Sequence, residues 1–136
     1  MSYFTNKSDI YLDVAEMAES KYMYPAVAHC AYYSCVHLMQ HLWYHKMGKT
    51  EKDLDIECST RKTGKHAVLI NEIGSFIKGN PKNRNARNDF QLFNSKITQL
   101  KKLRVDADYC DKEFDMKKSS SSITLAKEIL PILKRA

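Results

Sequence analysis

The sequence predicts an all-α protein, an up-down bundle of four to five helices. Apolar residues recur at spacings of three and four over long stretches, and no stretch alternates convincingly in the manner of a strand. Only four glycines and three prolines interrupt the chain, so long helices can form. The length of 136 residues and a hydrophobic fraction of 43% indicate one domain, residues 1–136, with a real core.

Five segments carry the helical spacing. They span about residues 8–20, 25–47, 65–78, 89–111 and 122–134. In the first segment, Ile10, Val14 and Met17 are expected to form a buried face together with Ala18. The second segment is apolar nearly all round, which predicts burial on two sides, inside the bundle or in a subunit interface.

Two polar stretches separate the helices. Residues 48–64 are expected to be mainly loop, which places Arg61 in a loop just before the third helix. Connections of that length are uncommon in small domains and often carry function. The serine run 119–122 is expected to be a linker or the N-cap of the last helix.

Composition limits the compartment and the partners. A formal charge of +6 is compatible with a polyanion such as RNA. The four cysteines form no Cys-x-x-Cys pair, which favours free thiols in a reducing compartment. The first residues lack the apolar run of a signal peptide, and no run is long enough to span a bilayer. A cytoplasmic protein without a membrane segment is therefore predicted.

The candidate catalytic residues are Arg61 and His66, in the pattern Arg-x-x-x-x-His. An arginine can hold a phosphate through two hydrogen bonds, and a histidine can transfer protons near neutral pH. In the alternative interpretation, His66 packs or caps at the start of its helix while Arg61 is solvated.

Basic residues on two loops are candidate phosphate contacts. Lys62 and Lys65 flank the proposed pair, and Lys82, Arg84 and Arg87 make a second basic loop. These cations are expected to bind an RNA backbone or the phosphates of a nucleotide. The alternative for the second loop is a solvated connection.

The end of the fourth helix carries three supporting residues. Arg104 and Asp108 lie one turn apart and can pair, and Tyr109 follows them. They either fasten the helix as a buried structural pair or line the site and orient His66. Tyr109 is also a candidate for modification by a partner nucleotidyltransferase.

Four histidines recur at multiples of four on the second helix, namely His29, His37, His41 and His45. Adjacent pairs have the spacing of a zinc chelate. No carboxylate or cysteine shares their stripe, and a spacing of four drifts around a helix. We therefore predict no metal and assign them to packing, a dimer seam or a nucleotide pocket.

Three motifs in this order resemble the HEPN superfamily of small helical proteins. The first is the run of small and aromatic residues at 31–38, and the second is the histidine that opens the third helix at 64–70. The third is Leu-x-x-Leu-Arg-x-x-Ala-Asp-Tyr-x-Asp at 100–111. Together the motifs cover most of the chain from Ala26 to Leu133.

The resemblance implies a four- to five-helix bundle that often dimerises. Many family members are metal-independent RNases of toxin or phage-defence systems, with an Arg-x-x-x-x-His motif from each subunit meeting across the homodimer. Carried over, the motif falls on Arg61 and His66, with no cofactor required. The alternative within the family is a non-catalytic module that binds nucleotide, or that partners a nucleotidyltransferase or an antitoxin.

Overall fold

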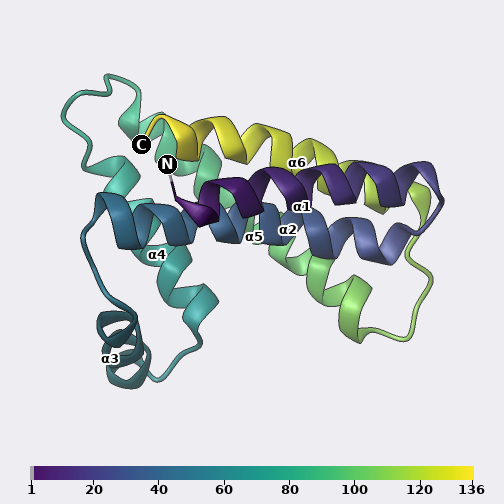
Figure 1. Cartoon of the computed structure of the whole chain (residues 1–136), viewed down its shortest axis with the longest axis horizontal. Helices are drawn as coiled ribbons and strands as arrows, with labels where there is room; N and C mark the ends of the chain where they lie inside the picture. Colours follow the sequence, from purple (N-terminus) through teal and green to yellow (C-terminus); the bar gives the residue numbers. More distant parts are fainter. Residues whose placement is uncertain (1) are drawn as a thin grey trace.

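The computed structural model describes residues 2–136. These residues contain six α-helices and one π-helical turn, joined by short connections. They are α1 (Tyr3–Ser20), α2 (Tyr24–His41), η1 (Leu42–Lys46), α3 (Glu51–Arg61), α4 (Lys65–Lys78), α5 (Ala86–Tyr109) and α6 (Met116–Lys134). The predicted all-α class is confirmed, with six helices in place of four to five. Helices α1, α2 and α6 pack together along the long axis, and α3 lies at one corner (Figure 1). Within residues 2–136, no helix has both the length and the apolar character needed to cross a bilayer.

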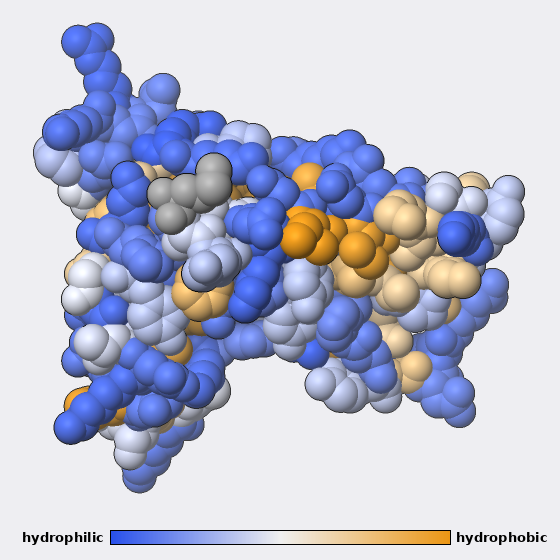
Figure 2. Space-filling view, in the orientation of Figure 1, coloured by the Kyte–Doolittle hydropathy of each residue, from blue (hydrophilic) through white to orange (hydrophobic). Residues whose placement is uncertain are grey.

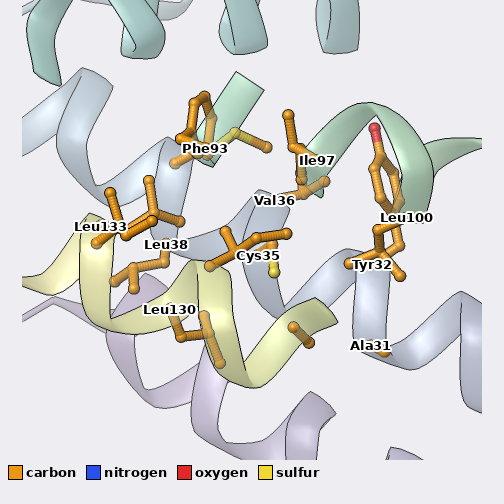
Figure 3. Close-up of a cluster of buried hydrophobic side chains, with 14 of the residues drawn as sticks. Ala31, Tyr32, Cys35, Val36, Leu38, Phe93, Ile97, Leu100, Leu130 and Leu133 are labelled. Carbon is orange, nitrogen blue, oxygen red and sulfur yellow. The ribbon is translucent and has the colours of Figure 1, made fainter. Parts of the chain in front are cut away.

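Helix α2 is the central element of the bundle. It packs against α1, α4, α5 and α6, as its all-round apolar surface predicts. Its small residues Ala28, Ala31 and Ser34 are fully buried, which lets neighbouring helices approach closely. Figure 3 shows side chains of α2 interleaved with those of α5 and α6, among them Tyr32, Cys35, Phe93, Ile97, Leu130 and Leu133.

The face that α1 buries agrees with the predicted one at Ala18 and differs from it at the three larger residues. Ile10, Val14 and Met17 are 48%, 42% and 58% exposed, and Figure 2 shows a hydrophobic patch over α1. The buried residues of α1 are Ser8, Ala15 and Ala18. These small residues allow closer contact with the bundle than the larger Ile10, Val14 and Met17 would, so packing distance decides which face turns inward. Ser8 lies within the second turn of α1, because the helix begins at Tyr3, five residues before the predicted start.

The stretch predicted to be mainly loop contains α3. Thr50 and Asp53 form a capping box, in which the Thr50 hydroxyl accepts from the Asp53 amide and the Asp53 carboxylate accepts from the Thr50 amide. Leu54 is buried, and the indole N–H of Trp43 in η1 donates to the Thr50 carbonyl at 3.0 Å. Arg61 is therefore the last residue of a helix, not part of a loop.

The last helix begins earlier than predicted because Asp115 caps it. The Asp115 carboxylate accepts from the Lys118 amide at 2.9 Å, which starts α6 at Met116. Ser119 and Ser122 are fully buried inside the helix, so the serine run is neither linker nor cap. Their small size lets α6 pack closely against its neighbours.

A buried carboxylate ties three separate segments together at one end of the bundle. Asp89, in the first turn of α5, is 3% exposed. It accepts from Nε and Nη2 of Arg135 at 2.9 and 2.8 Å, and from the Asn83 side-chain amide at 2.9 Å. The hydrogen bond from Arg135, with a smaller contribution from Asn83, lowers the pKa of Asp89 below its usual value.

The first prediction concerns this carboxylate. Asp89→Asn should lower the free energy of unfolding at pH 7 by about 1–3 kcal/mol, because the bonds to Arg135 lose their charge assistance. The pKa of the Asp89 carboxyl is lower in the folded state than in the unfolded chain. The contribution of this carboxylate to the free energy of unfolding is therefore fully present above pH 3.8 and declines as the pH falls below 3.8. Urea denaturation at several pH values measures both effects. The exposed Asp111→Asn serves as control, and equal stability of the two variants would contradict the role of Asp89.

Candidate functional site

Arg61 is paired with two glutamates. Its Nε lies 2.9 Å from Glu57 of the same helix, and its Nη2 bonds to Glu72 of α4. The hydrogen bond to Glu72 is the main reason that the pKa of Arg61 is raised. The guanidinium charge is thus balanced locally.

The hydrogen-bond partner of His66 is Tyr32, so the structure does not join the two residues of the Arg-x-x-x-x-His motif as a pair.

His66 is the second residue of α4 and is half-buried. Its Nδ1 lies 3.0 Å from the Tyr32 hydroxyl, and its ring centre is 5.6 Å from that of Tyr33. Burial, followed by the charges of Arg104 and Lys101, lowers the pKa of His66 below 6.5. The imidazole is therefore neutral at pH 7, and its Nε2 has no hydrogen-bond partner within residues 2–136.

Arg104 lies against three tyrosine rings. Its guanidinium carbon is 5.1, 5.7 and 5.6 Å from the ring centres of Tyr32, Tyr33 and Tyr109. Such cation–π contacts stabilise a guanidinium that is largely removed from water. The residue is 7% exposed, and its Nε has no hydrogen-bond partner among the described residues.

Asp108 stands between Arg104 and a second histidine. Its Oδ2 lies 2.8 Å from Nδ1 of His29 and 3.7 Å from Nη1 of Arg104. The predicted Arg104–Asp108 pair is therefore confirmed, although the longer distance leaves the Arg104 charge incompletely balanced. His29 has its ring centre 4.7 Å from that of Tyr33, so Tyr33 contacts both imidazoles.

We call this group the His66 cluster. Its members are His29, Tyr32, Tyr33, His66, Arg104 and Asp108. They come from α2, α4 and α5, so the packing of three helices sets the geometry. Tyr109, 74% exposed at the end of α5, accepts from Nη1 of Arg104 at 3.3 Å and borders the cluster.

The lysines next to the predicted pair lie in different surroundings. Lys65 has its ammonium 3.6 Å from Asp55 and 3.8 Å from Glu51, so it faces the acidic side of α3. Lys62 ends α3 in the left-handed region, with φ of 53°, and is exposed. Of the two, Lys62 is the one with no carboxylate within ion-pair distance among residues 2–136.

The second basic loop is separated from His66 by the length of α4. Lys82 and Arg84 lie between α4 and α5, and Arg87 lies in the first turn of α5. The 14 residues of α4 span about 20 Å. The two groups of predicted phosphate contacts are therefore at opposite ends of one helix and do not form one site.

The remaining histidines of the second helix have separate partners. His37 Nδ1 lies 3.0 Å from the Gln40 amide oxygen, and His41 Nδ1 lies 2.7 Å from the Ser2 hydroxyl. The rings of His41 and His45 stack with centres 5.4 Å apart. Within residues 2–136, no group of three or more His, Cys, Asp or Glu side chains has the arrangement of a metal site.

Sequence reasoning did not single out Tyr32 or Tyr33 as members of a site, and it left His29 open between packing, a dimer seam and a nucleotide pocket. His29 and Tyr33 are four residues apart and share a helix face, which is a usable signal. The contact of Tyr32 with His66 joins residues 34 apart, and no local pattern reveals it.

Comparisons of the chain with protein-family models, with curated proteins and with solved structures found no match. The resemblance to the HEPN superfamily therefore stays a prediction that depends on three motifs.

The second prediction concerns the charge near His66. Replacing Arg104 with Gln removes a nearby positive charge, so the pKa of His66 should rise toward 6.5; Lys101→Ala should raise it by less. NMR titration of the imidazole resonances measures the shift. Arg84→Gln, at the far end of α4, is the control. An unchanged pKa in the Arg104 variant would contradict the described geometry.

The same depressed pKa has a consequence for stability. The folded-state pKa of His66 is below 6.5, so its protonation favours the unfolded chain. The stability that this group contributes is present above pH 6.5 and declines as the pH falls below it.

Proposed function

We propose that the protein binds RNA and cleaves it without a metal ion, with the chemistry at the His66 cluster. One observation carries the proposal: a half-buried, neutral imidazole lies beside an arginine whose charge is incompletely balanced. Such a combination supplies a proton acceptor and a positive potential in one place.

The first step uses the nucleophile that RNA carries, the ribose 2′-hydroxyl. When Nδ1–H of His66 donates to the Tyr32 oxygen, the Nε2 lone pair is free to accept a proton. Burial raises the pKa of Tyr32, which keeps its hydroxyl neutral in this role. His66 takes the 2′-hydroxyl proton while the 2′-oxygen forms a bond to phosphorus.

The second step breaks the bond between phosphorus and the 5′-oxygen. His29, held at its Nδ1 by Asp108, is the second imidazole and protonates the leaving 5′-oxygen from Nε2. The products are a 2′,3′-cyclic phosphate and a 5′-hydroxyl. One proton is accepted and one is donated, so no cofactor is consumed.

Arg104 takes the electrostatic role that the sequence motif assigns to Arg61. Negative charge grows on the phosphorane-like transition state, and a fixed guanidinium nearby stabilises it without reorganisation. Arg61 instead pairs with Glu57 and Glu72, which links α3 to α4. This assignment departs from the family motif while keeping its histidine.

The biological setting belongs to the same proposal. We infer a HEPN-like homodimer in the cytoplasm that acts as a toxin or in phage defence. The basic net charge of +6 supports an RNA partner, and the three motifs support the family. A twofold axis beside α4 would bring two His66 clusters onto one RNA strand.

The third prediction tests the chemistry. Purified protein should cleave RNA in the presence of EDTA, and His66→Ala should lower the rate by about a hundredfold or more. Arg104→Gln should also lower it strongly, whereas Arg61→Ala should change it by no more than a few-fold. Gel electrophoresis with analysis of the cyclic phosphate measures both rate and product.

The matched control is His45→Ala, which removes an exposed histidine outside the cluster. Replacing the ribose 2′-hydroxyl with hydrogen should abolish cleavage at that position. Cleavage of equal rate by wild type and His66→Ala, or loss of activity in Arg61→Ala alone, would refute the assignment.

A second candidate function is a non-catalytic module that binds a nucleotidyltransferase or an antitoxin. Two observations favour it: the Arg61 charge is balanced by glutamates, and Tyr109 is largely exposed beside Arg104. An exposed phenol at a helix end is accessible to a modifying partner. Stable co-purification with such a partner, weakened by Tyr109→Phe, combined with no cleavage of RNA, would support this function over the first.

A further inference from the structure

Helix α3 is attached to the bundle by few buried contacts. It lies at one corner of the molecule, beside α4 (Figure 1). Within Glu51–Arg61, Leu54 is the single buried residue. Its side chain packs in a small hydrophobic cluster with Trp43 of η1 and with Val68 and Leu69 of α4. No residue of α3 belongs to the main core, which the other helices form.

The polar contacts between α3 and the bundle are partly exposed to solvent. Arg61 links α3 to Glu72 of α4, and these two side chains are 34% and 22% exposed. Ion pairs of this kind contribute little to stability, because water screens them. One hydrogen bond comes from a buried donor, the Trp43 indole N–H, which donates to the Thr50 carbonyl at 3.0 Å. Since local stability depends on buried contacts, α3 is expected to be held less firmly than the helices of the core.

A residue in the left-handed region adjoins each end of α3. Gly48, with φ of 65°, precedes the cap Thr50 by two residues, and Lys62, with φ of 53°, follows the last helical residue. Glycine adopts this conformation without strain, whereas the Cβ of Lys62 makes it unfavourable. We call residues 49–63 the α3 segment. The capping box of Thr50 and Asp53 lies wholly within this segment, so its hydrogen bonds do not tie α3 to the bundle.

The α3 segment covers the first turn of α4. Val68 and Leu69 are buried in the cluster that Leu54 completes, and His66 lies in the same turn as Val68. Release of the α3 segment would expose Val68 and Leu69 to water, so this turn would lose its apolar contacts on one side. His66 would then be held by its hydrogen bond to Tyr32 without the support of a packed helix end. Closure of the α3 segment therefore contributes to the position of the imidazole.

We propose that the α3 segment opens as a unit while the other helices stay folded, and that its closure holds His66 in place. A released helix of 11 residues is too short to persist in water, so opening includes the unfolding of α3. The fold thus contains a conformational switch beside the His66 cluster, in which the imidazole is fixed in the closed state and mobile in the open state. The consequence for RNA cleavage rests on the proposed function, whereas the opening itself does not.

Native-state hydrogen exchange, measured by NMR for each amide in the absence of RNA, tests the opening. Leu54→Ala should raise the exchange rates of the α3 amides at least about tenfold, because it removes the buried contact. Lys62→Gly should lower these rates about fivefold, because glycine relieves the left-handed strain. The slowest-exchanging amides of α2 and α5 should keep their rates in both variants.

Leu92→Ala removes an exposed leucine of α5 and is the matched control, which should leave the exchange rates of α3 unchanged. Circular dichroism confirms that each variant is folded, and Lys62→Gly provides the test if Leu54→Ala does not fold. Trp43 is the single tryptophan of the chain, so its emission should shift to longer wavelength at urea concentrations that leave the helical circular dichroism nearly unchanged. Equal acceleration of the α2, α3 and α5 amides in Leu54→Ala, or wild-type rates in Lys62→Gly, would overturn the opening of α3 as a unit.

The link to the candidate site has a separate readout. In Leu54→Ala the imidazole resonances of His66 should shift or broaden, whereas those of His37, in the middle of α2, should not. Unchanged His66 resonances together with faster exchange of α3 would overturn the role of α3 in positioning His66. Leu54→Ala should also cleave RNA more slowly than wild type. Absence of cleavage in wild type would refute the proposed function and leave the hydrogen-exchange result intact.

Discussion

The hydroxyl of Tyr32 connects the core of the bundle to its candidate site. The ring is fully buried in α2, beside Leu100 of α5, so its phenol needs a hydrogen-bond partner. That partner is His66, which the hydrogen bond orients at the start of α4. The face of the same tyrosine ring packs against the Arg104 guanidinium. The packing of three helices around one tyrosine thus determines where the imidazole, the guanidinium and the second histidine lie.

Sequence patterns predicted much of the fold and less of the site. Helical spacing identified α2, α4 and α5, because their apolar residues repeat over several turns. It missed α3, where a single buried residue, Leu54, gives no stripe and a capping box carries the signal. In α1 it placed Ala18 correctly but also turned Ile10, Val14 and Met17 inward, because hydrophobicity does not reveal which residues permit the closest packing.

The prediction of the site from sequence was limited in the same way, because it could not include contacts between helices. Arg61 and His66 are close in sequence, yet a capped helix directs the arginine toward Glu57 and Glu72. Arg104 and His66 are far apart in sequence, yet tertiary packing both buries the imidazole and places the cation near it, and the two effects, burial first, lower the pKa of His66. Spacing along the chain can suggest which residue types are available, but contacts between helices decide which of them act together.

In the proposed function, an RNA phosphodiester is bound at His66 and His29. Its most direct test is an NMR titration with a 2′-O-methyl RNA, which has the phosphate but cannot supply the nucleophile. The imidazole resonances of His66 and His29 should change at ligand concentrations that leave the resonances of His45 unaffected. Saturable binding of the RNA with no change in the resonances of His66 or His29 would show that the phosphodiester binds elsewhere.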